Sequence, residues 1–286
     1  MYYDDWYKKY LDVYKTGLKP KTRESYDLIH REYISPVLGS LQLQEISPED
    51  VQCALLAAGA RGSRQAQLTY TLMHAVLRRA VRSRLIAWSP VDAIDRPAHD
   101  AELGAALTDA DYAAALPALL EDLPLALAAL AGLRRGELAG LQWGDIDLHA
   151  GLIHVRRTRI RTGGALIVQL PKSVAGVRDV PILPPLLQLL RRCYQLRPHA
   201  WVIDCAPETI SHRWQRLQRD LQLSQPYRLH DLRHTYITRL LIAGCNPRIA
   251  QYLAGHASLD MTLRVYTHIT ADAAQREISR LAQSLQ

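Results

Sequence analysis

Apolar and aromatic positions in residues 1–92 recur every three or four residues, the spacing of one face of an α-helix. The clearest helix start is Ser47-Pro48: Ser47 is an N-cap, Pro48 takes the first helical position, and acids follow in the first turn. The pair Ser35-Pro36 is expected to end a helix. The pattern predicts helices over residues 4–14, 22–33, 48–58 and 63–84.

Helical spacing stops at residues 95–106, which carry Pro, Gly and charged side chains. We interpret this segment as a linker between a helical domain, residues 1–94, and a second domain, residues 107–286. Thr108 is the expected N-cap of the first helix after the linker. A long apolar helical stretch then leads to residues 132–138.

The pattern changes after Gly151, where apolar and polar positions alternate as in β-strands. Three strands are expected over residues 152–161, 165–170 and 177–182, with a turn at Thr162-Gly163-Gly164. Helices resume at Pro184, and Asn246-Pro247 starts another. The predicted fold class is therefore mainly α, with one small antiparallel β-sheet in the second domain.

Composition excludes several classes of protein. Of 286 residues, 48% are hydrophobic and 22% charged, as in globular proteins and unlike disordered or collagen-like chains. The longest apolar run, Leu123–Leu133, is shorter than the roughly 20 residues that a membrane-spanning helix needs. We read no signal peptide, and the four cysteines are scattered, so we expect a cytoplasmic protein. A zinc site is not expected, because the spacing of the candidate ligands fits no common zinc-binding pattern. These candidates are Cys193, His199, Cys205 and His212.

Basic residues are concentrated in two segments of a chain with net charge +7. Residues 51–91 contain arginines and no acid, and residues 152–197 contain a single acid, Asp179. Such segments are typical of proteins that bind polyanions, although a solvated basic surface is the alternative. The candidate phosphate contacts are Arg61, Arg64, Arg78, Arg82, Arg156, Arg157, Arg159 and Arg161.

The second domain also contains polar residues in motifs that a helical core does not require. The motifs GLRRGEL, HDLRHTY and LAGHAS occur in this order, followed by a tyrosine. Their order and gaps resemble those of the tyrosine recombinase (phage integrase) family. The segment from Leu18 to Val51 also resembles the core-binding domain of phage and conjugative-element integrases. The residues that carry the resemblance are Arg134, Lys172, His230, Arg233, His256 and Tyr266.

The resemblance implies DNA strand cleavage and transfer. Arg134 and Arg233 would clamp the phosphate, because guanidiniums stay charged and bind phosphate bidentately. His256 would add a hydrogen bond, and His230 would assist as a base or hydrogen-bond partner. Tyr266 would attack the phosphate and form a 3′-phosphotyrosyl link, which conserves the bond energy without ATP. No metal ion or other cofactor is expected, because the arginines supply the positive charge.

Lys172 stands out because it is the only lysine after Lys21. Lysine can give up a proton near neutral pH and arginine cannot, so an acid that protonates the leaving oxygen should resist replacement by arginine. The resemblance places the catalytic lysine of the family on this hairpin, in the turn between the second and third expected strands.

Each residue also has an ordinary interpretation. Arg134 alone could cap a helix, and the two histidines could belong to the core. Tyr236 and Tyr252 compete with Tyr266 as nucleophile, and we interpret both as packing residues. Glu137 is expected to support the arginine clamp, and Asp145 to pair with a basic neighbour.

Three other functions remain open from the sequence: a non-catalytic DNA-binding regulator on the same fold, an enzyme like type IB topoisomerases, and a helical scaffold. The regulator predicts the loss of at least one of the six residues, and all six are present.

The resemblance also implies partners. The two domains would enclose double-stranded DNA, and the working unit would be a tetramer on two recombination sites of a phage or mobile element, near the nucleoid. The amphipathic tail, residues 271–286, would pack within the chain or on a neighbouring protomer. Accessory DNA-bending or directionality factors are expected partners, and a membrane is not. An arm-binding domain, which many phage integrases carry, is not expected.

Overall fold

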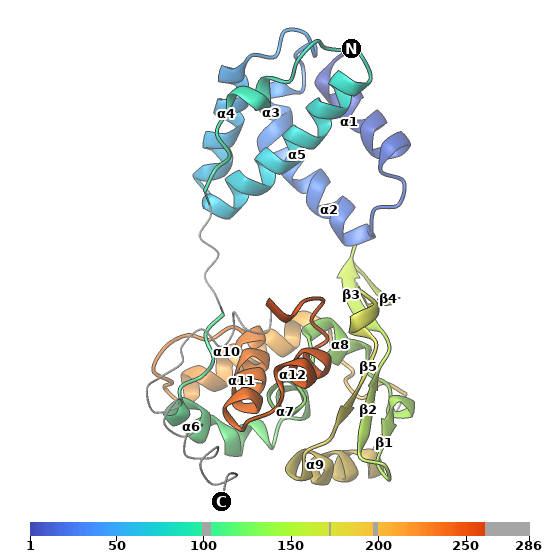
Figure 1. The fold of residues 1–286 in the computed structure, drawn as a ribbon, viewed down its shortest axis with the longest axis vertical. Coiled ribbons are helices and arrows are strands. Elements are labelled where there is room, and N and C mark those ends of the chain that lie inside the picture. Colours follow the sequence, from blue (N-terminus) through green and yellow to red (C-terminus); the bar gives the residue numbers. More distant parts are fainter. Residues whose placement is uncertain (99–103, 172, 197–199, 261–286) are drawn as a thin grey trace, which may run out of the picture. The chain divides into compact units, whose positions relative to one another are not determined.

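The structure is a computed structural model that describes residues 1–98, 104–171, 173–196 and 200–260. It divides into two compact units, Met1–Glu102 and Leu103–Gln286 (Figure 1). Each unit has its own hydrophobic core. Within the described ranges, no helix has both the length and the apolar character needed to cross a bilayer.

The first unit is helical. Helix α1 (Tyr3–Lys9) continues into the π-helical turn η1 (Tyr10–Tyr14), and α2 (Pro20–Ile29) continues into the π-helical turn η2 (His30–Ile34). The other long helices are α4 (Pro48–Gly59) and α5 (Ser63–Arg82). The short elements are α3 (Ser35–Leu38) and the 3₁₀ turn η3 (Pro90–Ala93). The N-cap at Ser47 is confirmed, because its side chain accepts a hydrogen bond from the Asp50 backbone N–H, 3.2 Å away. The predicted break at Ser35-Pro36 is wrong. Pro36 lies in the first turn of α3, where a proline without N–H is tolerated, and the helical path continues to Leu38.

The core of the first unit forms where α5 packs against α2 and α4. The buried face of α5 includes Leu72, Val76 and Leu77. Trp6 of α1 is buried in the same core and donates a 3.0 Å hydrogen bond from its indole N–H to the Val76 carbonyl. This bond leaves the large indole with no unpaired polar atom in the core.

The second unit is built around one buried helix. Its helices are α6 (Asp109–Leu119), α7 (Leu123–Leu130), α8 (Arg135–Gly140), α9 (Pro184–Gln195), α10 (Pro207–Asp220), α11 (Leu229–Ile242) and α12 (Pro247–Ala254), with 3₁₀ turns η4 (Trp143–Asp145) and η5 (Val174–Gly176). Helix α7 is the apolar run seen in the sequence, and it is buried because α6, α8, α9, α10 and α11 all pack against it. The predicted caps at Thr108 and Asn246 are confirmed.

Two small antiparallel sheets, rather than the predicted single one, complete the second unit. Strands β1 (Ile146–Asp147), β2 (Leu152–Val155) and β5 (Arg178–Pro181) form one sheet, in the order β1-β2-β5. Strands β3 (Thr158–Thr162) and β4 (Ala165–Gln169) form the other, a hairpin whose turn contains Gly163 and Gly164 at positive φ.

The predicted strand 152–161 is broken after Val155 for a physical reason. The Arg157 side chain bonds to Asp145 and Gln142, which directs the chain away from the first sheet. Helix α8 then packs closely on β3. A Cβ atom at Gly140 would lie 3.0–3.1 Å from the backbone of Thr158 and Arg159, so glycine favours this close approach.

Candidate active site

Arg134 lies at the start of α8, directly after a tight turn. Gly132 has φ +62°, and a Cβ atom there would collide with the Tyr236 ring. The Arg134 guanidinium donates from Nη1 to Glu137, at 2.7 Å, and from Nη2 to the Gly255 carbonyl, at 2.6 Å. The side chain is 34% exposed, so one side of this cation faces solvent.

Arg233, on α11, is buried with only 1% of its surface exposed. It donates hydrogen bonds to the carbonyls of Gly132 and Ala254. Its Nε atom is also buried and has no hydrogen-bond partner among the described residues. Burial, followed by the charge of Arg134, lowers the pKa of Arg233 to about 9, so its guanidinium is still charged at neutral pH.

The two arginines meet at the end of α12. This helix ends at Gly255, whose φ of +60° is the left-handed conformation typical of a C-terminal cap. Its last carbonyls each accept a hydrogen bond from a different arginine: Leu253 from Arg178, Ala254 from Arg233 and Gly255 from Arg134. Three cations thus gather at the negative end of one helix dipole.

Glu137 connects two of these arginines, and one of them is Arg134, the residue it was expected to support. The carboxylate accepts bonds from Arg134, at 2.7 Å, and from both terminal nitrogens of Arg178, at 3.1 and 3.0 Å. Burial alone would raise its pKa, but the charges of Arg178, Arg134 and Arg233 lower the pKa to about 2. Sequence reasoning missed Arg178, although its two-residue spacing from Val180 on a strand was a signal that both face inward.

His256 and His230 complete the group. His256 directly follows Gly255 and is 5% exposed, whereas the His230 side chain is exposed, although its ring packs edge-on against His234. The pKa of His256 is lowered to about 3 by desolvation and by Arg233 and Arg134. Desolvation and the neighbouring His234, Arg233 and Arg134 lower the pKa of His230 to about 3. Both imidazoles are therefore neutral at neutral pH and can donate or accept hydrogen bonds.

Four of the six predicted residues thus converge: Arg134, His230, Arg233 and His256. Lys172 and Tyr266 lie outside the described residues, as does the predicted tail, residues 271–286.

The two rival tyrosines differ in environment. Tyr236 is buried, as expected, and burial raises its pKa to about 12. The interpretation of Tyr252 as a packing residue is wrong, because its side chain is half-exposed and its hydroxyl accepts a 3.1 Å hydrogen bond from the Asp179 backbone N–H.

Sequence comparison identifies the family. A sequence model of the phage integrase family matches residues 105–272, and a model of the N-terminal SAM-like domain of phage integrases matches residues 3–55. The chain belongs to the phage integrase family. The resemblance seen in the motifs is therefore confirmed.

Curated relatives of this integrase-family chain include proteins of a transposon and of a prophage. It is 28% identical over 177 residues to the transposase of transposon Tn916 of Enterococcus faecalis. The aligned region covers 54% of this chain and 44% of the relative. It is also 28% identical over 301 residues to the prophage phiRv2 integrase of Mycobacterium tuberculosis, which covers 94% of this chain and 75% of that relative. The chain thus matches less than half the length of the transposon relative.

Solved structures confirm the fold. The Tn1549 transposon integrase, in complex with transposon right end DNA, superposes with a TM-score of 0.82 at 24% identity and covers 99% of this chain and 100% of that chain. A lambda integrase tetramer bound to a Holliday junction gives a TM-score of 0.68 at 22% identity, covering 89% of this chain and 77% of that chain. The predicted mainly helical, two-domain recombinase architecture is therefore confirmed.

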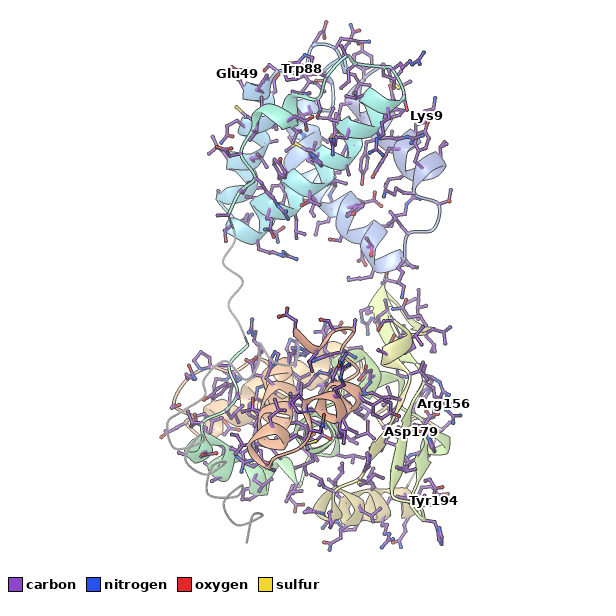
Figure 2. All side chains as sticks on the ribbon, viewed as in Figure 1. Lys9, Glu49, Trp88, Arg156, Asp179 and Tyr194 are labelled. Carbon is purple, nitrogen blue, oxygen red and sulfur yellow. The ribbon has the colours of Figure 1, made fainter. Side chains whose placement is uncertain are left out.

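The candidate phosphate contacts of this family member differ in exposure. Arg157 is half-buried and bonded to Asp145. Arg159 is buried, donates to the Ile203 and Cys205 carbonyls at 2.9 and 3.2 Å, and stacks over the Trp201 ring. The Arg159 guanidinium therefore bonds inside the protein, and the expected contact of Arg159 with a DNA phosphate is not supported. The exposed candidates are Arg61, Arg64, Arg78, Arg82, Arg156 (labelled in Figure 2) and Arg161.

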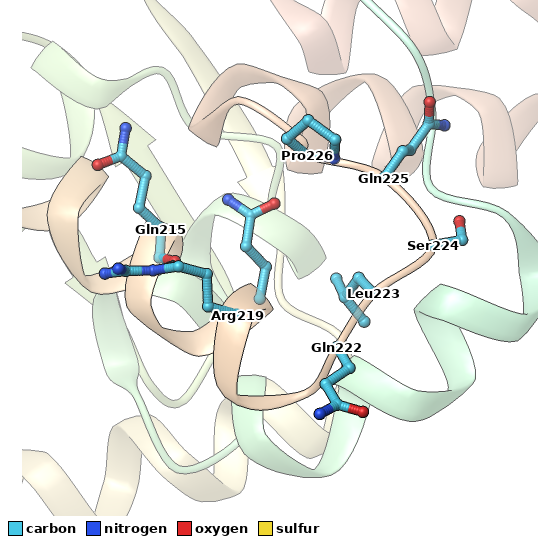
Figure 3. Close-up of a pocket in the computed structure, with 8 residues that line it drawn as sticks. Gln215, Arg219, Gln222, Leu223, Ser224, Gln225 and Pro226 are labelled. Atoms are coloured by element: carbon cyan, nitrogen blue, oxygen red, sulfur yellow. Dashed lines mark hydrogen bonds between the residues drawn. The ribbon is translucent and has the colours of Figure 1, made fainter.

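A separate pocket of about 560 Å³ lies at the turn between α10 and α11 (Figure 3). Glutamines, Arg219 and Ser224 line it, and none of the predicted site residues does. Over the described residues, no group of three or more His, Cys, Asp or Glu side chains is arranged to hold a metal ion.

Proposed function

We propose that the chain is a site-specific DNA recombinase that breaks and rejoins DNA strands through a covalent 3′-phosphotyrosyl intermediate. The observation that carries this proposal is the convergence of Arg134, Arg233, His230 and His256 at the end of α12. These side chains bring two permanent cations and two neutral imidazoles to one place. Such a group can stabilise the negative charge of the pentacoordinate transition state at the scissile phosphate.

In this mechanism the two guanidiniums bind the non-bridging oxygens of the scissile phosphate. Arg134 has five N–H donors, and its bonds to Glu137 and Gly255 use one each, so donors remain for phosphate. The buried Nε of Arg233 is a further donor. His256 adds a hydrogen bond from its neutral imidazole.

Bond breaking is assigned to Tyr266 and Lys172, both predicted from the sequence. The Tyr266 oxygen attacks phosphorus, and the bond from phosphorus to the 5′ oxygen breaks. The phenol proton passes to His230 or to water, and the 5′ oxygen takes a proton from Lys172. Rejoining is the reverse reaction with the 5′ hydroxyl of a partner strand. The arginines supply the positive charge, so this chemistry needs no metal ion and no ATP.

The two units are assigned different tasks. Residues 1–94 form the core-binding domain, residues 95–106 the linker and residues 107–286 the catalytic domain. The exposed arginines Arg61, Arg64, Arg78, Arg82, Arg156 and Arg161 contact phosphates, which positions the protein without reading sequence.

The assembly is proposed from the relatives. A lambda integrase tetramer has been solved bound to a Holliday junction, and we propose a tetramer on two DNA sites for this chain. Integration or excision of a phage or mobile element, at the nucleoid in the cytoplasm, fits the mobile-element origin of the relatives. Accessory DNA-bending or directionality factors are further proposed partners.

The test is adduct formation. Nicked duplexes made from the DNA on either side of the gene are mixed with wild-type protein and with Tyr266→Phe, without metal or ATP. The proposal predicts an SDS-resistant protein–DNA adduct with the wild type only. Tight DNA binding without any adduct would instead support a non-catalytic regulator. Relaxation of supercoiled DNA of any sequence would support a topoisomerase.

A further inference from the structure

Arg178 is a buried cation that the proposed chemistry does not use. Its side chain is fully buried, with 0% of its surface exposed. Nε donates to the Leu253 carbonyl at 2.7 Å, and both terminal nitrogens donate to Glu137 at 3.1 and 3.0 Å. Nη1 also donates to the Gly176 carbonyl at 3.2 Å. A buried charge is tolerated only when it is paired and hydrogen-bonded in this way.

The bonds of Arg178 join two elements that each carry a proposed site residue, and a third element beside them. Through Glu137 it reaches Arg134 at the start of α8. Through Leu253 it holds the last turn of α12, three residues before His256. Through Gly176 it holds the 3₁₀ turn η5, which leads into β5.

The packing around Gly255 strengthens this link. A Cβ atom at Gly255 would lie 2.9 Å from Nη1 of Arg178 and 2.8 Å from the Ala175 carbonyl oxygen. The Arg178 guanidinium thus lies directly against the turn that presents His256. The carbonyl of the same Gly255 accepts the bond from Arg134. Displacement of Arg178 would therefore move both the turn and the Arg134 donor.

We propose that Arg178 is a positioning residue for phosphate binding, which sets the orientation of Arg134 through Glu137 and of His256 through the end of α12. This role rests on the proposed function. It needs the planar fork of arginine, because two parallel N–H groups meet the carboxylate while Nε points at Leu253. A lysine keeps the charge, but its single ammonium does not reproduce this geometry.

A purely structural role is the alternative, and the chain offers a matched control. Arg159 is also buried and also donates to two backbone carbonyls, but its bonds lie at Ile203 and Cys205. Arg159→Lys therefore reports the general cost of replacing a buried arginine. The measurements are the melting temperature, the Kd for duplex DNA and the single-turnover cleavage rate at saturating DNA, all on the full chain.

We expect Arg178→Lys to bind DNA within threefold of wild type and to cleave about 100-fold more slowly per folded molecule, the scale of a misplaced catalytic group. Arg159→Lys should lower the melting temperature comparably and cleave at close to the wild-type rate. Glu137→Gln should also slow cleavage, and the defect of the double variant should be much smaller than the product of the two single defects, because both residues act on Arg134.

A substrate change separates positioning from instability. A methylphosphonate at the scissile position removes a negative charge and lessens the need for a guanidinium. The defect of Arg178→Lys should shrink on this substrate, whereas a loss of folded protein would slow both substrates equally. The proposal is overturned if Arg178→Lys or, should that variant not fold, Glu137→Gln cleaves at the wild-type rate. If wild-type protein binds but forms no adduct, the proposed function fails, and this role fails with it.

Discussion

Arg134 and Gly255 are joined by a 2.6 Å hydrogen bond that links the start of α8 to the end of α12. The bond places a proposed phosphate ligand beside the turn that leads into His256. Because Arg178 and Arg233 bond to the two preceding carbonyls, the last turn of α12 is held by three guanidiniums. The orientation of the proposed site therefore depends on how this helix ends.

The first prediction concerns Arg134 and its neighbour. Arg134→Lys should reduce the single-turnover cleavage rate by about 100-fold to 1,000-fold, because a lysine cannot hold Glu137, Gly255 and phosphate together. Arg135→Lys is the matched control, since Arg135 is exposed and one residue away. Its rate should stay within twofold of wild type. Equal losses in the two variants would count against a specific role for Arg134.

The Gly255 turn gives a second prediction. Gly255→Ala introduces both a strained φ of +60° and a collision with Arg178 and Ala175. Gly151→Ala is the control, because its φ is +67° and no atom lies within 4 Å of the new Cβ. Strain alone should cost Gly151→Ala about 1–2 kcal/mol. Urea unfolding should show a clearly larger cost for Gly255→Ala, and only this variant should lose cleavage activity; equal costs would argue that the close packing is unimportant.

Glu137 makes stability depend on pH. A pKa lowered from 4.5 to about 2 in the folded protein stabilises it at pH values above 4.5, and this contribution is lost as pH falls from 4.5 toward 2. The shift corresponds to about 3 kcal/mol. Glu137→Gln should therefore unfold more easily than wild type at pH 7, with a difference that shrinks as the pH is lowered to 3. Urea unfolding of both proteins across this range is the measurement, and a difference that does not change with pH would contradict the ion-pair account.

The two site histidines give a prediction in the same direction, but in a higher pH range. Their pKa values of about 3 lie below the ordinary 6.5, so the unfolded chain binds protons first as the pH falls. The free energy of unfolding should therefore decrease as the pH falls below 6.5. NMR of histidine-labelled protein should show that the ring signals of His230 and His256 do not titrate between pH 5 and 8. The same rings in urea should titrate near 6.5. Titration of His256 near 6.5 in the folded protein would mean that the site carries a cationic imidazole.

The sequence predicted much of the site because local signals were strong. Ser47, Thr108 and Asn246 mark helix starts through backbone chemistry that depends on few neighbours. Arg134 and Arg233 were predicted from motifs, and the structure brings both to one helix end.

The features that were missed depend on tertiary contacts. Arg178 was not predicted, because its partners, Glu137 and Leu253, lie 41 and 75 residues away. Arg159 was expected at the surface, but its guanidinium is buried and bonds to the carbonyls of Ile203 and Cys205. Both lie more than 40 residues away in the sequence. The break between β2 and β3 depends in the same way on the bond of Arg157 to Asp145. Strand alternation indicates that Arg178 faces inward, but no local pattern identifies these distant partners.

The central claim is that Tyr266 becomes covalently joined to DNA, and trypsin tests it directly. Cleavage after Arg264 and Arg276 releases a peptide from Val265 to Arg276 in which Tyr266 is the only tyrosine. The rivals Tyr236 and Tyr252 fall in other tryptic peptides. Mass spectrometry of the adduct after nuclease digestion should find the nucleotide on the Tyr266 peptide. A nucleotide on either rival peptide, or on none, would contradict the account.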